Sequence, residues 1–201
     1  MRRLAPFAFC LLTAPVWAGT VSSEYTKLDA EKDCAVFSAA GDDGGDWADM
    51  ICSGYRGYPV LLYYGDARES LFYGLPPGGD LAPAWESFSA FNSTGPTIEW
   101  RIETDGDVKV PFATIHRWFV SADPENPDKS VEVLAIEKVG QVTDRSGCVV
   151  GYVVASGNAG ANEAARRIAD QRARAFECGA DEPTIEQGSV PMPDYVLRYD
   201  N

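Results

Sequence analysis

The sequence is poor in the side chain that most enzymes use for acid–base catalysis. Its 201 residues include a single histidine, His116. Histidine is the only side chain whose unperturbed pKa lies near neutral pH, and it is the commonest metal ligand. A transition-metal site built from several imidazoles is therefore excluded, and we expect no cofactor. A histidine-dependent hydrolase would have only one general base.

Basic residues are also scarce. The chain has 17 lysines and arginines against 30 aspartates and glutamates, which gives a net charge of −13. A chain this acidic is repelled by the phosphates of nucleic acids and by anionic membrane surfaces. Neither is expected as a partner. A chain of this charge is suited to a basic partner, such as a basic protein of the cell envelope, but the interpretation that we prefer is that the charge serves solubility.

No apolar run approaches the roughly 20 residues needed to cross a bilayer. A shorter one lies at the N-terminus, where Arg2 and Arg3 precede an apolar stretch that ends in Val16-Trp17-Ala18. A basic start, a short apolar stretch and small residues before a cleavage point are typical of a secretory signal peptide. We predict that residues 1–18 are removed, that the mature chain is periplasmic or secreted, and that it does not insert into the membrane.

Cysteine is infrequent, and one of the five, Cys10, lies in the predicted leader. In an oxidising compartment the other four, Cys34, Cys52, Cys148 and Cys178, are expected to form two disulfides and not to act as nucleophiles or metal ligands. Four cysteines allow three pairings. The order along the chain favours Cys34 with Cys52 and Cys148 with Cys178, since each pair closes a local loop.

The mature sequence is rich in strand-like segments. Alternating apolar and polar residues, or short apolar runs rich in β-branched and aromatic residues, indicate strands. We predict strands at 47–52, 58–64, 69–73, 98–103, 108–120, 131–139 and 148–155, with a short one inside 25–37. Because the strands form one block and do not alternate with helices, we predict an α+β fold. Its core would be a mainly antiparallel sheet of about six or seven of these strands, followed by one C-terminal helix.

The strand at 98–103 has one apolar and one charged face. Ile98, Trp100 and Ile102 alternate with Glu99, Arg101 and Glu103. We expect the apolar face to meet the core and the charged face to meet water. Asp105-Gly106 predicts a tight hairpin into the next strand, which we expect to be irregular near Pro111.

The predicted helix covers residues 158–178, where the apolar residues Ala161, Ala165, Ile168, Ala169 and Phe176 recur at three- and four-residue spacing. Asn158 is the predicted N-cap, and Gly179 is the predicted left-handed residue after the helix. Arg172 lies on the apolar stripe, so we expect it to snorkel or to pair with a carboxylate. Residues 19–182 are predicted to form one domain, and residues 183–201, with three prolines, a loosely held tail.

The candidate binding residues are Tyr55, Arg56 and Tyr58 in a glycine-rich loop, together with His116 and Trp118, which share one face of a predicted strand. Tyrosine and arginine are enriched among residues that dominate binding energy at interfaces. We expect the face with His116 and Trp118 to point outward, because Ile115, directly before His116, is expected to point inward. Packing within the sheet core is the alternative interpretation of these aromatic residues.

Two other patterns have a chemical interpretation. His116 would act as a general base if the fold brought Ser53 or Ser70 and Asp66 to it, although no Gly-x-Ser-x-Gly motif is present. The Asp42–Asp46 cluster offers oxygen ligands for a hard cation such as calcium, but it lacks the spacing of a helix–loop–helix site. We interpret that cluster as a solvated loop.

Three stretches of the chain are the residues 52–60 (CSGYRGYPV), 95–101 (GPTIEWR) and 111–118 (PFATIHRW). In these stretches the chain resembles a group of small exported bacterial proteins of unknown function. The resemblance implies export, a cysteine-stapled domain and the Gram-negative periplasm as destination. Our leading hypothesis is a non-enzymatic binding or interaction domain, of which a lysozyme-inhibitor-like role is one form. The alternatives are an envelope hydrolase that uses His116 and a structural envelope component.

Overall fold

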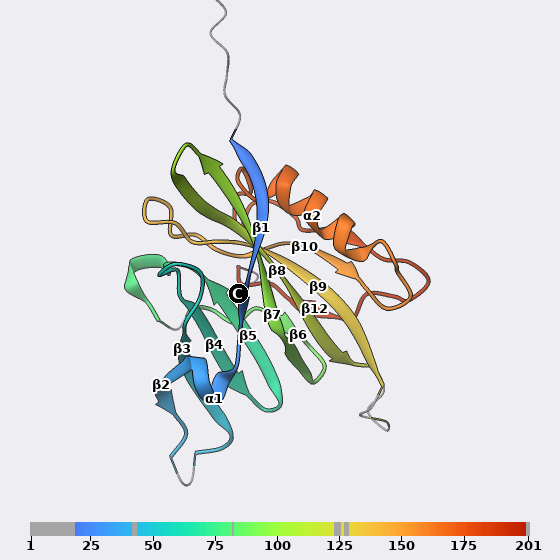
Figure 1. Cartoon of the computed structure of the whole chain (residues 1–201). Helices are drawn as coiled ribbons and strands as arrows, with labels where there is room; N and C mark the ends of the chain where they lie inside the picture. The colour runs from blue at the N-terminus through green and yellow to red at the C-terminus, as the bar shows by residue number, and fades with distance from the viewer. Residues whose placement is uncertain (1–18, 42–43, 82, 123–125, 127–128, 200–201) are drawn as a thin grey trace, which may run out of the picture.

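The computed structural model describes residues 19–41, 44–81, 83–122, 126 and 129–199 (Figure 1). The predicted leader and two residues of the Asp42–Asp46 cluster, Asp42 and Asp43, lie outside these ranges. In chain order the elements are β1 (Thr20–Lys27), α1 (Ala30–Asp33), β2 (Cys34–Ala39), β3 (Trp47–Cys52), β4 (Val60–Gly65), β5 (Arg68–Tyr73), a 3₁₀ turn η1 (Pro77–Gly79), β6 (Ser87–Phe88), β7 (Asn92–Asp105), β8 (Val108–Ser121), β9 (Ser130–Lys138), β10 (Val149–Val154), α2 (Ala161–Arg172), β11 (Thr184–Glu186) and β12 (Tyr195–Val196).

The described residues confirm an α+β fold, but with more strands than the six or seven predicted. Twelve strands form three sheets, and a second helix, α1, has only four residues. Three of the additional strands, β6, β11 and β12, contain two or three residues each. Segments this short cannot show the alternation from which strands are predicted.

The largest sheet has the strand order β1-β7-β8-β9-β10-β11 and is antiparallel except for the pair β10 and β11. The β7–β8 hairpin turns at Asp105-Gly106 as predicted, and Gly106 has a φ of 57°, which suits glycine. The register shifts where Ile102 pairs with Pro111. This confirms the predicted irregularity, because proline has no N–H to donate to the ladder.

The second sheet is the antiparallel meander β2-β3-β4-β5. Its strands β3, β4 and β5 occupy the segments in which strands are predicted. Cys34 at the start of β2 lies opposite Cys52 at the end of β3, and the two form a disulfide. The β4–β5 turn is closed by Asp66 and Ala67, both with left-handed φ angles, 51° and 56°.

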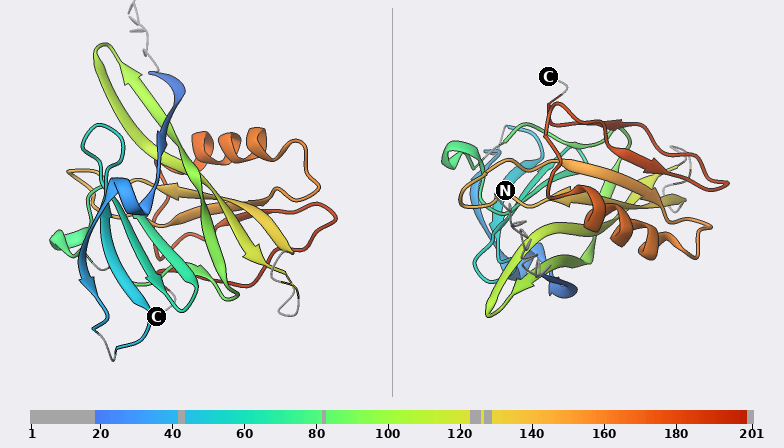
Figure 2. Two further views of the ribbon diagram at one scale, coloured as in Figure 1. Left: turned by 60° about the horizontal axis from the view of Figure 1, so that its bottom comes forward. Right: turned by 90° about the horizontal axis from the view of Figure 1, so that it is seen from above.

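The six-stranded sheet is the middle layer of the fold (Figure 2). One of its faces packs against the four-stranded sheet through a core that includes Leu62, Leu71, Trp100, Trp118 and Val133. The other face packs against α2 through a second core that includes Ile115, Ile136, Val150, Ala165 and Ile168. Both faces of the middle sheet are therefore covered, and its side chains have no broad solvent-facing side.

The charged face of β7 does not meet water as predicted. Glu99 and Arg101 are only 8% and 7% exposed. Arg101 donates to both carboxylate oxygens of Asp170 on α2, at 2.9 and 2.7 Å, and Arg166 on the same helix donates to Glu99 at 2.7 Å. The charged face is thus covered by a helix that supplies matching charges, which is compatible with burial of ionised groups.

Helix α2 is shorter than predicted but buries the predicted stripe, with Ala161, Ala165, Ile168 and Ala169 inside. Its N-cap is Gly160 and not Asn158. Asn158 lies two residues before the N-cap, and its Oδ1 accepts a hydrogen bond from Gly160 N at 3.0 Å. The helix ends at Arg172, and Gly179, with a φ of 83°, lies in a later turn. Arg172 does not reach a carboxylate; it donates to Thr184 Oγ1 and to the Glu182 carbonyl.

The C-terminal segment is tied into the fold and is not the loose tail predicted for it. Strand β11 adds to the edge of the middle sheet beside β10, and β12 pairs with β6. Arg198 follows β12 and is 4% exposed. The prolines of this segment interrupt any periodicity in the sequence. The segment is held instead by pairing with strands that are distant in the chain and by one buried arginine.

Both disulfides have the predicted pairing, Cys34–Cys52 and Cys148–Cys178. The second joins the residue before β10 to the segment that follows α2, across 30 positions of the chain. Disulfides persist in oxidising compartments. Within the described ranges, none of the helices has the length and apolar character needed to span a bilayer.

Candidate functional site

His116 lies in the interior, between the two larger sheets, and not on an outward face as predicted. Its side chain is fully buried, and its Nδ1 and Nε2 lie 2.7 Å from Tyr73 Oη and 2.6 Å from the Gly95 carbonyl oxygen. Since a carbonyl only accepts, Nε2 carries the proton and Nδ1 accepts from the tyrosine hydroxyl. Burial lowers the pKa of His116 to about 4. The ring is neutral and both nitrogens are occupied.

The residues of a hydrolytic triad are not brought together. Among the described residues, His116 hydrogen-bonds to no serine, threonine or carboxylate. Ser70 Oγ accepts a bond from Glu86 N at 3.0 Å, and Asp66 is paired with Arg68 at 2.7 Å. The geometry therefore gives no support to a hydrolase that uses His116. The prediction of an outward face failed because it assumed that only one side of the strand is covered.

Trp118 and Tyr55, two of the candidate binding residues, are core residues. Trp118 is 2% exposed, and its ring packs on Phe88 with centroids 5.5 Å apart. Tyr55 is 6% exposed and packs against Trp100 with centroids 6.1 Å apart. For these residues the alternative interpretation, core packing, agrees with the structure.

Arg56 and Tyr58 remain accessible from the same loop. Arg56 is exposed in a left-handed conformation, with a φ of 47°. Tyr58 is half-buried, and its hydroxyl donates to Gln141 at 3.0 Å. Tyr58 lines an open groove beside the Cys34–Cys52 disulfide. The structure thus separates the candidate set into an accessible pair and an interior group that share no surface.

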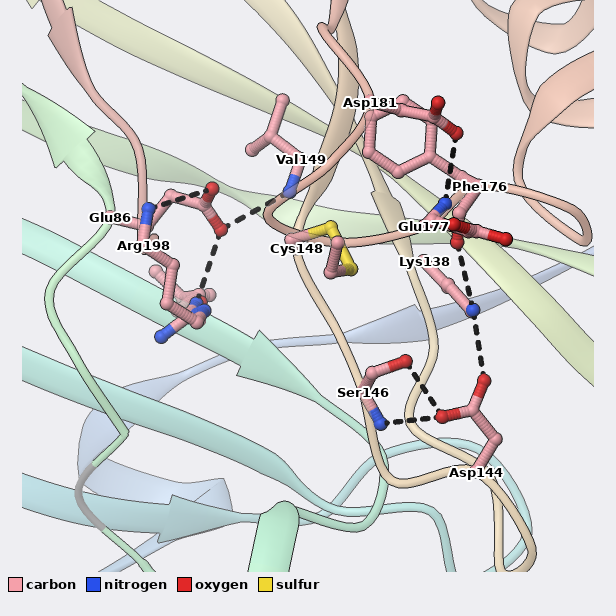
Figure 3. The surroundings of a disulfide bond; sticks show 12 residues. Glu86, Lys138, Asp144, Ser146, Cys148, Val149, Phe176, Glu177, Asp181 and Arg198 are labelled. Atoms are coloured by element: carbon pink, nitrogen blue, oxygen red, sulfur yellow. Dashed lines mark hydrogen bonds and ion pairs between the residues drawn. A yellow bond between two sulfur atoms is a disulfide. The ribbon is translucent and has the colours of Figure 1, made fainter. Parts of the chain in front are cut away.

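A buried ion pair that the sequence did not predict joins the C-terminal segment to the interior (Figure 3). Arg198 Nη2 lies 3.3 Å from Glu86 Oε2, and Glu86 also accepts bonds from the backbone N–H groups of Val149 and Arg198. Arg198 also donates to the carbonyls of Leu71, at 2.8 Å, and Ala84. Most polar atoms of the Glu86 and Arg198 side chains thus bond to each other or to the backbone, so we assign this pair a structural role.

Glu137 is a second buried carboxyl group near this pair. Burial and the neighbouring Glu86 raise the pKa of Glu137 well above its usual range, with Arg198 opposing the shift. Burial also raises the pKa of Glu86, although Arg198 lowers it. The cavity that Glu86 lines beside the Cys148–Cys178 disulfide has a volume of about 60 Å³. This is room for a few water molecules and not for a substrate.

The acidic charge is concentrated on one layer of the molecule. Residues 29–89 comprise α1, the four-stranded sheet and the segment that leads to β6, and we call them the acidic layer. They contain 11 acidic and 3 basic residues, whereas residues 90–201 contain 18 acidic and 11 basic residues. Most arginines of the second part are paired with carboxylates; the pairs are Arg101–Asp170, Arg117–Glu132, Arg166–Glu99, Arg167–Glu186 and Arg174–Glu103.

Several carboxylates of the acidic layer have no ion pair among the described residues. They are Glu31, Asp33, Asp46, Asp49 and Glu69, of which the first and third are exposed. Charges without partners keep their full attraction for an incoming cation, whereas paired charges largely cancel one another. Unpaired carboxylates also occur outside the acidic layer, for example Asp105 and Asp107, but the layer has the denser net charge, −8 for residues 29–89 against −7 for residues 90–201.

An open groove with two tryptophans lies at one end of the acidic layer. It is lined by Trp47, Trp85, Gly65, Arg68, Asp46 and Asp66 and has a volume of about 540 Å³. This site was not predicted from the sequence. Its only local signal is a tryptophan directly after an acidic glycine-rich loop, a pattern that equally fits the start of a strand.

The described residues contain no group of three or more histidine, cysteine, aspartate or glutamate side chains arranged to hold a metal ion. Comparison of the chain with protein-family models, with curated protein sequences and with solved structures found no significant match.

Proposed function

We propose that this chain is an exported protein-interaction domain whose acidic layer binds a basic protein of the cell envelope. The observation that carries the proposal is the density of negative charge on the layer that also holds the tryptophan-lined groove, since residues 29–89 carry a net charge of −8 and the longer segment 90–201 carries −7. Charge complementarity between protein surfaces raises association rates and selects partners of opposite sign. An acidic layer with exposed aromatic residues is suited to a basic protein surface.

Export is supported by the two disulfides and by the leader-like pattern of residues 1–18. Disulfides are rare in proteins of the cytosol, where thiols are kept reduced. A periplasmic or secreted destination also agrees with the partner proposed, since a basic envelope protein would share that compartment.

A non-enzymatic role is supported by the position of the only histidine. His116 is fully buried, neutral and hydrogen-bonded at both ring nitrogens. The buried carboxyl group of Glu86 adjoins a space too small for a substrate. The accessible chemistry of the acidic layer is that of recognition: carboxylates and indole rings.

Affinity capture from a periplasmic extract tests the proposal. The mature protein, immobilised through its C-terminus, is expected to retain a protein with a pI well above 7, which salt elutes because screening weakens exposed charge pairs. The captured protein is then purified and its binding measured directly. Capture that yields only acidic proteins, or binding that salt does not weaken, would contradict the proposal.

A lysozyme-inhibitor-like role is one specific form of this function, because lysozymes are basic hydrolases that act on the envelope. Purified protein at micromolar concentration is added to a panel of lysozymes, and hydrolysis of cell walls is followed. Inhibition of at least one enzyme would support this form. No inhibition across the panel would eliminate it while leaving the wider proposal to the capture experiment.

A further inference from the structure

We propose that strand β2 (Cys34–Ala39) binds an extended, basic segment of the partner protein, which adds to the four-stranded sheet as a further strand. This inference rests on the proposed function and identifies the part of the acidic layer that the partner contacts. We call the side of β2 that faces away from β3 the open edge.

The open edge has no strand beside it. β2 is the first strand in the sheet order β2-β3-β4-β5, and it pairs only with β3. Figure 1 shows it at the margin of the molecule. Among the described residues, β2 makes no backbone hydrogen bond outside its ladder with β3. A row of unpaired N–H and C=O groups is a template for pairing with another chain.

The pairing with β3 shows which backbone groups point to the open edge. Cys34 and Cys52 lie opposite one another, with Cα atoms 3.9 Å apart. Just before them, the carbonyl of Asp33 accepts a hydrogen bond from Ser53 N at 2.9 Å. In an antiparallel ladder, the close pair next to a bonded pair exchanges no backbone bonds. The N–H and C=O groups of Cys34, and of Val36 two positions later, therefore point to the open edge.

An added antiparallel strand would exchange backbone hydrogen bonds with Cys34 and Val36. The register shifts between Val36 and Ser38, where β2 has one extra residue, so the regular ladder ends there. Such a bulge limits the length over which another strand can pair. The pairing would be short, like that of β11, which joins the middle sheet through three residues.

The opposite edge of the same sheet, β5, is covered by other parts of the fold. Glu69 N donates to Asn92 Oδ1 at 3.0 Å, and the carbonyl of Leu71 accepts a bond from Arg198 at 2.8 Å. The backbone groups that β5 turns away from β4 thus have partners within the chain. The four-stranded sheet can grow only at β2.

The side chains of β2 lack the usual protection of an edge strand. In the middle sheet, the edge strand β11 has three residues, and the edge strand β1 carries Glu24 and Lys27. Short edges and charged side chains discourage pairing with another chain. The sequence of β2 (CAVFSA) contains neither a charge nor a proline, and Val36 and Phe37 are 59% and 40% exposed. β2 therefore combines an open edge with side chains that favour a partner strand.

The charge around β2 selects its occupant. Exposed Glu31 belongs to α1, which directly precedes β2. At the other end, Ala40 N donates to the Trp47 carbonyl at 3.0 Å, and exposed Asp46 directly precedes Trp47. A segment with lysine or arginine near its ends would be attracted to both carboxylates. A second copy of this chain would bring together two acidic layers, each with a net charge of −8, and is disfavoured.

Titration of the mature protein with synthetic peptides tests the inference. The probe is acetyl-Lys-Val-Thr-Val-Lys-amide, whose β-branched residues favour an extended conformation, and acetyl-Glu-Val-Thr-Val-Glu-amide is the acidic comparison. The backbone amide signals of Cys34 and Val36 are followed by NMR, with the amides of β1 as the internal control. We expect the basic peptide at millimolar concentration to shift both signals and to slow their exchange with solvent. The acidic peptide should do neither.

The same amides are then followed in the complex with the captured basic protein, where we expect Cys34 and Val36 to be protected from exchange. Absence of protection with both the basic peptide and the captured protein would overturn the inference. Protection of β1 in place of β2 would overturn it as well, because the partner would then bind at another edge. Equal effects of the basic and the acidic peptide would contradict the choice of a basic occupant.

Val36→Pro removes one donor from the open edge without changing any charge. Because the N–H of Val36 points away from β3, the ladder between β2 and β3 keeps its hydrogen bonds, and proline is tolerated on edge strands. We expect the variant to bind the basic peptide and the captured protein at least about tenfold more weakly, since it loses a hydrogen bond and its ring obstructs the edge. The matched control is Val36→Ala, which keeps the N–H and should lose much less.

These measurements separate the two proposals. If the captured basic protein binds Val36→Pro as well as the wild type and leaves the open edge unprotected, the inference is wrong, although the acidic layer can still be the interface. If no basic protein is captured, the proposed function fails, and the peptide titration alone decides whether the open edge accepts a basic strand. If Val36→Pro lowers only self-association, the occupant is a second copy and the inference is wrong. Unchanged chemical shifts of His116 in the core show that each variant is folded.

Discussion

The guanidinium of Arg198 lies 3.3 Å from the carboxylate of Glu86, although the two residues are 112 positions apart in the chain. Each side chain is 3% exposed. Arg198 follows the last strand, and Glu86 precedes β6, so the pair ties the C-terminal segment to the centre of the fold. A charge this deeply buried is tolerated only when it is paired and hydrogen-bonded.

Arg198→Met is expected to lower the free energy of unfolding by about 3 to 5 kcal/mol, because it leaves Glu86 buried without its partner. Denaturant unfolding followed by tryptophan fluorescence measures the change. The double variant Arg198→Met/Glu86→Leu should recover part of the loss, since it removes both charges.

The control for this prediction is Arg167→Met, which breaks the pair with Glu186. Those side chains are 49% and 37% exposed. Exposed pairs contribute about 0 to 1 kcal/mol. Equal destabilisation by the two single variants would show that the Glu86–Arg198 pair does not have the structural role assigned to it.

The imidazole of His116 is expected to titrate with a pKa of about 4, because burial opposes its protonation. As this is the only histidine, its ring signals in an NMR titration are unambiguous. The unfolded chain takes up this proton near pH 6.5, so stability falls as the pH is lowered from 6.5 to about 4, by about 3 kcal/mol in total. His116→Gln should remove this part of the pH dependence. A pKa near 6.5 would mean that the ring is solvent-accessible.

Glu137 is expected to give the opposite pH dependence. Its pKa is raised in the folded state, so the folded protein keeps a proton that the unfolded chain releases above about pH 4.5. Stability therefore falls as the pH rises from 4.5 towards the folded pKa. Glu137→Gln keeps the shape of the group and removes the titration, so its stability relative to the wild type should increase with pH. A difference that is constant between pH 5 and 8 would argue against a protonated Glu137.

Loss of the Cys148–Cys178 disulfide is expected to lower the free energy of unfolding by about 3 to 4 kcal/mol, as the chain-entropy estimate gives for a loop of this length. The bridge spans 30 positions and joins the start of β10 to the segment after α2. The double variant Cys148→Ala/Cys178→Ala is compared with the wild type by thermal unfolding. No change in the midpoint would show that the bridge does not constrain the unfolded chain.

Local patterns predicted the middle of the fold well. The β7–β8 hairpin, its irregularity at Pro111 and the buried stripe of α2 follow from alternation, turn chemistry and helical spacing. Alternation also led to an error, because it was assumed that a charged or polar face meets water. The side chains of Glu99, Arg101 and His116 are covered instead, by a helix and by a second sheet whose positions no local pattern reveals.

The sites depended on contacts between distant parts of the chain, which the sequence did not predict. Glu86 and Arg198 meet only after the C-terminal segment crosses the fold. Trp47, Gly65 and Trp85 line one groove because three strands and a loop converge. The predicted binding residues were chosen by residue type, and three of the five, Tyr55, His116 and Trp118, are buried. The other two, Arg56 and Tyr58, are accessible.

The most direct test of the account compares two variants with the same change in charge. Glu31→Lys/Asp46→Lys reverses two exposed, unpaired carboxylates of the acidic layer, and Asp105→Lys/Asp107→Lys reverses two exposed ones at the β7–β8 turn. The affinity of each for the captured basic protein is measured by calorimetry at low ionic strength. We predict a loss of at least about tenfold for the first variant and a much smaller loss for the second. Equal losses would contradict the account, because attraction would then follow net charge and not the acidic layer.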